Sequence, residues 1–413
     1  MHRTYIFSVC LLFLLSSSAV LADQTAQSDS TPSGISPSEG ASTSPRPGAP
    51  PGSVQQSVSL PDYFYRHLTG TIGGKYRIVM NLMRNGGHVL GDYYYVDQGI
   101  PLFFGYDSRI TTDGQIHLVE TNQFGQGGSD KVTGVFDGRF VGKNEVRGTW
   151  TKSGSSSSLP FALSTVGVAE GAFDIAHVER GYYDRSHGSA KMDVTYPVMR
   201  TKSAETDAAF NANVVSAVVS LYENGVNELP PTTISQAMRD FVHAFAAQLG
   251  SNDSRTYFPP WSYSITAQVL FNAAGIVSMR YEAFSFEGGA HPNTVYTNSS
   301  YVRATGSVIT LDDLLKPGYE KKLNAIGLQE FRREHGIKEG QSLAGAGYFV
   351  NDNTFHLNHN FFITKAGLVF QFNQYEIAPY YFGAQQVLIP FPALKGLLLP
   401  HSPIESLTSR TGE

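Results

Sequence analysis

Residues 75–96 read KYRIVMNLMRNGGHVLGDYYYV, and this stretch decides the fold of the N-terminal part of the chain. Before Asn85-Gly86-Gly87, apolar and polar side chains alternate with the period of two that indicates a half-buried strand. Asparagine and glycine tolerate the positive φ angles of tight hairpin turns, and a second strand-like run follows directly. The stretch therefore predicts an antiparallel β-hairpin.

Similar short runs continue outward from this hairpin over about residues 60–165. Asp113-Gly114 and Asp137-Gly138 supply further turn sequences between the runs. About eight or nine strands, each a hairpin apart, predict an antiparallel meander that closes into a small barrel. Further strands are expected at Val89–Val96, Pro101–Gly105, Gln115–Thr121, Val132–Phe136, Val146–Trp150 and Leu159–Leu163.

From about residue 170 the pattern changes to α+β. Helices are expected to begin at Ser203 and Thr233, since each is a good N-cap residue ahead of apolar residues at helical spacing, and a third is expected over Tyr319–Glu334. Helices packed on an antiparallel sheet are the natural layer arrangement for such a segment, so the fold class is multidomain, all-β and then α+β. The strands of the sheet are expected at Met192–Val198, Ser262–Phe271, Ile276–Phe286, Phe361–Thr364, Leu368–Asn373 and Val387–Pro390.

The N-terminus has the order of a secretory signal peptide. Arg3 precedes an apolar run over residues 5–15, and small residues lead up to Ala22. We expect cleavage after Ala22 and a periplasmic or secreted protein. The whole chain is then predicted to contain a signal peptide (1–22), a disordered Ser/Pro/Gly-rich linker (23–58), a small β-barrel-like domain (59–166), an α+β subdomain (170–272), a C-terminal domain (273–398) and a disordered tail (399–413).

Composition excludes several classes of protein. Cys10 is the only cysteine and lies in the predicted signal peptide, so disulfides, thiolate zinc sites and a cysteine nucleophile are not expected in the mature chain. The net charge is −5 and the lysines and arginines are scattered, which makes nucleic acid an unexpected partner. Oligomeric state stays open.

His291 follows a predicted strand on the turn Gly288-Gly289-Ala290-His291-Pro292. Two glycines permit a turn that other residues could not make, and the proline stiffens its exit. His291 is either a ligand-facing base or donor on a rigid turn, or a structural histidine at the end of a strand.

The segment Tyr375 to Gly383 (YEIAPYYFG) gathers aromatic side chains around one carboxylate. Tyr375, Tyr380 and Tyr381 together with Glu376 could form a sugar or peptide platform. Alternatively, Glu376 is a buried acid that holds its loop by hydrogen bonds to backbone amides. These four residues and His291 are the candidate ligand-binding residues.

Two other motifs do not predict a metal site. His356-x-x-His359 is the only close histidine pair, but its surroundings indicate turn and strand, and the glutamate of a His-Glu-x-x-His motif is missing. Thr310 to Leu314 is similar to the Thr-Phe-Asp-Asp-Gly motif of polysaccharide deacetylases, without the matching histidine segment. An acidic turn at the start of a helical segment explains Asp312 and Asp313 better. We expect no metal and no cofactor.

The order and spacing of several motifs resemble a bacterial extracytoplasmic family. It is the C-terminal domain of the anti-sigma factor RsiV, which also occurs beside the deacetylase PdaC as a non-catalytic accessory. Residues 175–272, with Tyr196-Pro197 in a strand, resemble the PdaC-type subdomain that precedes it. The motifs in the C-terminal part are Gly288–Pro292, Thr305-Gly306, Ile309–Leu314, Gly367–Phe370, Tyr375–Gly383 and Ile389–Phe391.

This resemblance implies an exported sensor or accessory module, with lysozyme recognition in the RsiV branch. We therefore expect a non-catalytic binding protein, not an enzyme, for a lysozyme-like protein or a peptidoglycan or other cell-wall glycan. The alternative is a hydrolase of wall glycans or peptides that uses Glu376 and His291 as acid and base, which requires the two groups to converge on one substrate.

Overall fold

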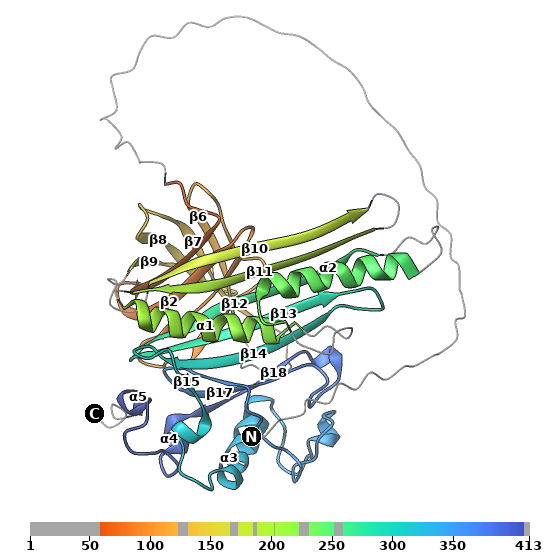
Figure 1. Ribbon diagram of the computed structural model, residues 1–413. Coiled ribbons are helices and arrows are strands. Elements are labelled where there is room, and N and C mark those ends of the chain that lie inside the picture. Colours follow the sequence, from red (N-terminus) through yellow and green to blue (C-terminus); the bar gives the residue numbers. More distant parts are fainter. Residues whose placement is uncertain are drawn as a thin grey trace, which may run out of the picture. The chain divides into compact units, whose positions relative to one another are not determined.

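The computed structural model describes residues 58–122, 131–165, 172–184, 188–201, 203–222, 231–251 and 259–408 (Figure 1). All of these residues belong to one compact unit, Gln55–Glu413. The predicted signal peptide, nearly all of the predicted linker and the last residues of the tail lie outside the described residues. Within the described ranges, no helix is both long and apolar enough to cross a bilayer.

The N-terminal strands form a closed antiparallel barrel, as the sequence predicts. Consecutive strands pair from β1 to β4 and from β5 to β9, β1 also pairs with β9, and the pairing of β4 with β6 closes the ring. Leu68, Leu82, Leu118 and Phe136 are fully buried, so side chains fill the interior. The strands are β1 (Tyr63–Ile72), β2 (Tyr76–Asn85), β3 (His88–Tyr95), β4 (Pro101–Phe104), β5 (Arg109–Ile110), β6 (Gln115–Asn122), β7 (Lys131–Phe140), β8 (Glu145–Lys152) and β9 (Ser158–Thr165).

Glycines set the closest approach of two barrel strands. Gly138 of β7 faces Gly148 of β8 in the ladder. A Cβ atom on Gly148 would collide with the carbonyl oxygen of Asp137. Two facing positions without side chains therefore let the backbones of β7 and β8 approach closely on the barrel wall.

The second part is a six-stranded sheet with two helices on one face (Figure 1). All neighbouring pairs are antiparallel except β11 and β12. Parallel strands need a long crossover connection, and α1 and α2 lie in the chain between these two. The elements are β10 (Ala172–Asp184), β11 (Gly188–Arg200), α1 (Ala204–Ser220), α2 (Ile234–Ser251), β12 (Trp261–Ala273), β13 (Ile276–Phe286), β14 (Asn293–Val302) and β15 (Val308–Ile309).

The predicted helix starts are confirmed. The side chain of Ser203 caps α1 by accepting a hydrogen bond from the backbone of Thr206, and Thr233 Oγ1 accepts one from the backbone N–H of Gln236 at the start of α2. The acidic turn is confirmed too, because the Asp313 carboxylate accepts hydrogen bonds from the backbone and hydroxyl of Thr310.

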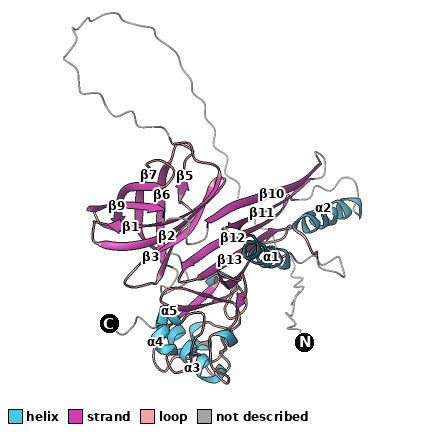
Figure 2. Ribbon diagram, turned by 60° about the vertical axis from the view of Figure 1, so that its left-hand side comes forward, coloured by secondary structure: helices cyan, strands magenta, loops and turns pink. Residues whose placement is uncertain are grey.

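The C-terminal part combines a three-stranded sheet with short helices, and Figure 2 shows α3, α4 and α5 together, apart from α1 and α2. The predicted helix over Tyr319–Glu334 is confirmed as α3, which begins one residue later. The elements are α3 (Glu320–Glu334), β16 (Phe361–Ile363), β17 (Gly367–Phe372), β18 (Gln385–Pro390), α4 (Phe391–Leu394) and α5 (Glu405–Thr408), with 3₁₀ turns at Leu311–Asp313, Ala344–Ala346 and Tyr380–Phe382.

Polar groups join these parts in the interior. Asn81 of the barrel donates a hydrogen bond to the carbonyl of Leu270 in β12 at 3.0 Å, and Ser278 of β13 donates one to Ile363 in β16 at 2.7 Å. The guanidinium of Arg280 lies 5.0 Å from the ring centroid of Phe103 in the barrel. The face of the sheet opposite α1 and α2 is therefore covered by barrel strands and by the small sheet.

Candidate functional site

The predicted residue His291 lies on the turn between β13 and β14. Gly288 and Gly289 both have positive φ angles, +91° and +104°, which glycine adopts without strain. His291 Nδ1 lies 2.8 Å from the carbonyl oxygen of Pro292, so this nitrogen carries the proton and donates. The imidazole stacks on the ring of Tyr380 at 4.1 Å.

The predicted aromatic loop joins β17 to β18 and meets this turn. Tyr380 donates a hydrogen bond to Pro292 at 3.0 Å, and its ring lies 5.6 Å from that of Tyr375. Tyr381 is 77% exposed, and its ring lies 4.7 Å from that of Phe382. The structure thus gathers His291, Tyr375 and Tyr380, three predicted residues from two separate loops.

Glu376 has a role in holding this loop. Its carboxylate accepts hydrogen bonds from the backbone N–H of Asn373 at 2.8 Å and from Asn358 Nδ2 at 2.7 Å. Among the described residues, Glu376 and His291 share no hydrogen bond or ion pair. The geometry therefore does not support Glu376 and His291 as an acid–base pair. Contact of Glu376 or His291 with a ligand stays a prediction.

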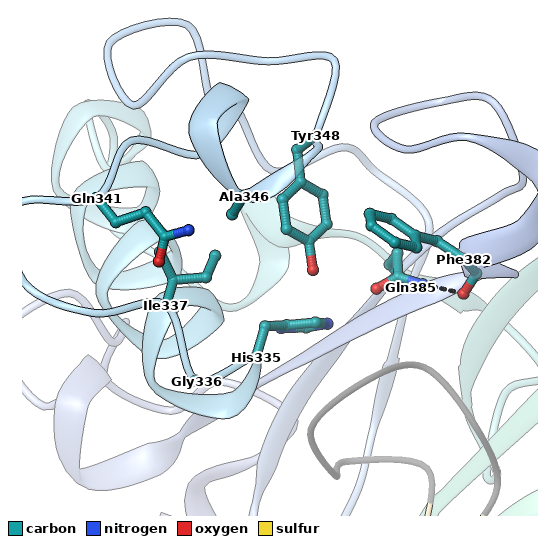
Figure 3. A pocket seen from close by; sticks show the side chains of 8 residues that line it. All are labelled: His335, Gly336, Ile337, Gln341, Ala346, Tyr348, Phe382 and Gln385. Carbon is teal, nitrogen blue, oxygen red and sulfur yellow. Dashed lines mark hydrogen bonds between the residues drawn. The ribbon is translucent and has the colours of Figure 1, made fainter.

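A hollow of about 240 Å³ opens on the other side of the same loop. Figure 3 shows His335 at its base, with Tyr348 above it and Gln385 opposite. Phe382, which follows Tyr381 in the chain, forms one wall and packs against Tyr348 at 5.4 Å. The remaining lining residues are Gly336, Ile337, Gln341 and Ala346.

His335 is the group in this hollow that can accept a proton. It stands at the C-cap of α3, where its Nδ1 lies 2.9 Å from the carbonyl oxygen of Phe331 and donates to it. The ring stacks on Phe331 at 3.9 Å. Because the proton of the neutral ring sits on Nδ1, the other nitrogen, Nε2, is the basic one, and Figure 3 shows that end of the ring directed across the hollow toward Gln385.

Burial lowers the pKa of His335, although the hydrogen bond to Phe331 and the side chain of Gln385 oppose this effect. The imidazole is therefore neutral at neutral pH. Gln385 is fixed by donating from Nε2 to the carbonyl of Phe382 at 2.6 Å, which leaves its amide oxygen on the side of the hollow (Figure 3). When His335 takes up a second proton, two acceptors are already in place for its N–H groups.

Tyr348 supplies a hydroxyl that stays protonated. Burial raises its pKa to about 12, so at neutral pH it is a hydrogen-bond donor. In Figure 3 the hydroxyl points down into the hollow above His335. The hollow therefore pairs a neutral base with a neutral donor, both on aromatic walls.

The sequence gives little sign of this hollow. His335 stands directly before Gly336 at the end of a predicted helix, and a histidine there is ordinarily explained by the helix dipole. Phe331, four residues before His335, is expected on the same helix face, but this spacing does not indicate a hollow. The partners Tyr348 and Gln385 are distant in sequence, so only the fold brings them together.

Glu334, the neighbour of His335, is a buried acid. Burial raises its pKa to about 7 from 4.5, against a lowering effect of its hydrogen bond from the backbone of Leu388. Between these two values the unfolded chain releases a proton that the folded chain retains, so the free energy of unfolding falls as the pH rises from about 4.5 to about 7.

Replacing Glu334 with glutamine is expected to remove this part of the pH dependence, because the amide keeps an acceptor for Leu388 and does not titrate. Urea unfolding at several pH values between 4 and 8 measures it. Glu339→Gln, at an exposed position, is the matched control and keeps the wild-type slope. Equal slopes in Glu334→Gln and the wild type would contradict the prediction.

Metal ligands do not gather in the described part of the chain. No group of three or more His, Cys, Asp or Glu side chains is placed there to hold an ion. His356 lies in a loop with its Nδ1 3.3 Å from the amide nitrogen of Asn324.

Two family models match the chain. Residues 185–294 match the model described as deacetylase PdaC, and residues 312–392 match DUF3298, a family of unknown function. This is the arrangement of a PdaC segment followed by its DUF3298 partner, so the resemblance inferred from the sequence is confirmed. The hollow at His335 lies in the DUF3298 segment.

One curated relative is 33% identical over 115 residues, the esterase Rv3036c of Mycobacterium tuberculosis. The match covers 27% of this chain and spans about half (48%) of the relative's length. Two solved structures of DUF3298 proteins are also similar. The one from Bacteroides fragilis is 19% identical, covers 58% of this chain and 99% of its own, and has a TM-score of 0.48, while that from Pseudomonas aeruginosa is 16% identical, covers 56% and 96%, and has a TM-score of 0.41.

The expectation that the chain is not an enzyme is wrong on these comparisons. The matching model is described as a deacetylase and the relative is named an esterase, and both point to hydrolase activity. The sequence-based expectation depended on the missing deacetylase motif and on the accessory role implied by the RsiV resemblance. Neither excludes catalysis by residues of the PdaC and DUF3298 segments themselves.

Proposed function

We propose that this chain, in which a PdaC segment precedes a DUF3298 segment, is an exported hydrolase that removes small acyl groups from a cell-envelope glycan. The observation that carries the proposal is His335: a neutral imidazole, fixed through Nδ1, with Nε2 directed across a hollow that also holds the Tyr348 hydroxyl. The name of the mycobacterial relative supports an ester as the bond that is cleaved.

Water is the nucleophile in this proposal, because no serine, threonine or cysteine is among the residues that line the hollow. Nε2 of His335 takes a proton from the water as its oxygen attacks the acyl carbon, and the imidazolium then returns the proton to the leaving alcohol oxygen. The Tyr348 hydroxyl donates a hydrogen bond to the carbonyl oxygen as negative charge develops on it. A hollow of about 240 Å³ suits a small acyl group and not a sugar ring with it.

The glycan part of the substrate would lie outside the hollow, on exposed aromatic rings. Phe349 and Tyr381 are 58% and 77% exposed, and each is the chain neighbour of a residue that lines the hollow. The backbone N–H of Phe349 donates to Ile377 at 2.8 Å, which places it against the predicted aromatic loop. Such rings offer flat apolar faces beside the opening, and the predicted platform residues Tyr375, Tyr380 and His291 extend them.

Hydrolysis of p-nitrophenyl acetate by the purified protein tests the proposal, with kcat/KM followed from pH 4 to 9. Because burial lowers the pKa of His335, the base stays unprotonated below the ordinary histidine value of about 6.5. We expect kcat/KM to be constant through neutral pH and to fall only below this ordinary histidine value. Absence of hydrolysis of this ester and of acetylated oligosaccharides would refute the proposal, and an inflection above pH 7 would refute His335 as the base.

Replacing Tyr381 with alanine is expected to raise KM for an O-acetylated oligosaccharide about fivefold and to leave kinetics on p-nitrophenyl acetate unchanged. The ring is exposed and packs only on Phe382 among the aromatic pairs of the described residues, so truncation leaves the fold intact. Tyr106→Ala, at a 94% exposed position of the barrel, is the matched control. The same KM in both variants would place the glycan elsewhere.

A further inference from the structure

The loop that follows α3, residues 336–352, forms one side of the hollow at His335. All its residues are described, and it contains no helix or strand other than the 3₁₀ turn at Ala344–Ala346. Tyr348 belongs to this loop, and its ring lies 6.0 Å from that of His335 at an angle of 89° (Figure 3). The place of the Tyr348 hydroxyl above the base therefore depends on the individual contacts that hold the loop against α3.

Arg332, on α3 three residues before His335, makes several of these contacts. Its Nη2 donates hydrogen bonds to the carbonyl oxygens of Lys338 and Gln341, both at 2.7 Å. Its Nη1 donates to Asp352 Oδ2 at 2.9 Å. The planar guanidinium presents its nitrogens in fixed positions, so it holds three points of the loop at once, which the single nitrogen of an ammonium group does less well. These three contacts are called the Arg332 clasp below.

Asp352 extends the clasp to Tyr348. Its second carboxylate oxygen, Oδ1, accepts a hydrogen bond from the backbone N–H of Leu343 at 3.0 Å. The carbonyl oxygen of Leu343 in turn accepts one from the backbone N–H of Tyr348 at 3.1 Å. The side chain of Leu343 is fully buried, which fixes the middle of this chain of hydrogen bonds. A continuous path thus leads from α3 to the backbone of Tyr348.

The neighbouring arginine, Arg333, shows the contrast with an ordinary surface residue. Its side chain is 63% exposed and pairs with Glu330 and Glu334 on the same helix. Such exposed pairs contribute little to stability. The side chain of Arg332 is only 19% exposed, and its carboxylate partner Asp352 lies 20 residues further along the chain. Its contacts therefore join the helix to the loop.

We infer that Arg332 is a positioning residue for the proposed hydrolysis, which fixes the Tyr348 hydroxyl relative to the base His335. This role rests on the proposed function, in which that hydroxyl stabilises the charge on the carbonyl oxygen. Such stabilisation requires a donor that is held in place before the reaction. Arg332 does not line the hollow, so it acts on the substrate through Tyr348.

The loop has a second attachment that does not involve Arg332. Phe349, the neighbour of Tyr348, donates its backbone N–H to the carbonyl oxygen of Ile377 at 2.8 Å. Loss of the clasp should therefore loosen the loop without removing it from the hollow. A displacement of about 1 Å at a catalytic group is enough to lower a rate by up to about 10²-fold.

A double-mutant cycle on p-nitrophenyl acetate hydrolysis by the purified protein tests the role of Arg332. Tyr348→Phe removes the hydroxyl and is expected to lower kcat about 10²-fold. Arg332→Met is expected to lower kcat about tenfold with KM unchanged, and to cause no further loss when Tyr348→Phe is already present. The same loss of kcat from Arg332→Met in both backgrounds would overturn a role through Tyr348.

Trypsin digestion tests the clasp without ester hydrolysis, with the fragments identified by mass spectrometry. Lys338 is exposed and its carbonyl oxygen is held by Arg332, so cleavage after Lys338 requires local opening of the loop. Cleavage there is expected to be about tenfold faster in Arg332→Met and about threefold faster in Asp352→Asn. Asp352→Asn breaks the ion pair but keeps an acceptor for Leu343, so it serves even where Arg332→Met does not fold.

Arg333→Met is the matched control and keeps wild-type rates in both assays, because the Arg333 side chain pairs within its own helix. Unchanged cleavage after Lys338 in Arg332→Met and Asp352→Asn overturns the clasp, whatever the activity. Absence of ester hydrolysis in the wild type refutes the proposed function and the positioning role of Arg332 with it. Faster cleavage in the two variants would in that case still show that Arg332 holds the loop, so the two failures are distinguishable.

Discussion

Replacing His335 with glutamine is expected to lower kcat/KM for ester hydrolysis by about 10²–10⁴-fold, the usual contribution of general base catalysis. Glutamine keeps a donor for the Phe331 carbonyl and a similar volume in the hollow, but it cannot take a proton from water. The loss should therefore appear mainly in kcat, with KM little changed.

The matched control is His359→Gln. His359 is an exposed histidine in the same part of the chain, so this variant corrects for nonspecific imidazole catalysis of an activated ester. Wild-type kinetics are expected for it. If both variants keep wild-type activity, the base lies elsewhere; if both lose it equally, the reaction is not confined to the hollow. The pH profile of His335→Gln should also lack the acidic inflection of the wild type.

The second large effect concerns stability. Phe331→Ala is expected to lower the free energy of unfolding by about 3–5 kcal/mol, because a fully buried aromatic side chain is lost and a cavity remains. Phe331 packs against Tyr348 at 5.1 Å and Phe355 at 5.3 Å, so it is the part of α3 that holds the aromatic wall of the hollow. Urea unfolding at fixed pH measures the change.

Lys322→Ala, on the exposed face of the same helix, serves as the control and is expected to change stability by less than about 0.5 kcal/mol. A loss below about 1.5 kcal/mol in Phe331→Ala would mean that neighbouring side chains collapse into the space and would contradict this prediction. The variant should also lose most of its hydrolytic activity, since His335 stacks on the removed ring.

The parts of the fold that depend on local chemistry were predictable from the sequence. Gly86, with a φ of +59°, marks the β2–β3 turn because few residues other than glycine adopt positive φ. Ser203 marks the start of α1 because its hydroxyl accepts a backbone hydrogen bond. β10 carries no such signal. Val178 and Glu179 are both exposed in it, so its side chains do not alternate between core and solvent.

The site was predictable only in part, for the same reason. The turn at His291 and the loop at Tyr380 are each unusual in sequence, but their stacking depends on β14 and β18 ending near each other. His335 needs Phe331, Tyr348 and Gln385, which are brought together by the packing of α3 on β18 and by the loop before β16. The periodicity of apolar residues within single helices and strands does not indicate which distant residues meet in this way.

The pairing of β1 with β9 has a consequence for how the chain acquires its structure. Leu68 of β1 faces Thr165 of β9, so the barrel can close only after its last strand has formed. Pairing across so much intervening chain is slow compared with hairpin formation. All barrel strands have nevertheless been made once Thr165 emerges, whereas β12, which packs on β2 and β3, follows much later. As the chain emerges from its N-terminus onward, the barrel can thus be complete while its docking surface, including Asn81 and Phe103, is still exposed to solvent. That interval is when the chain most needs protection from aggregation.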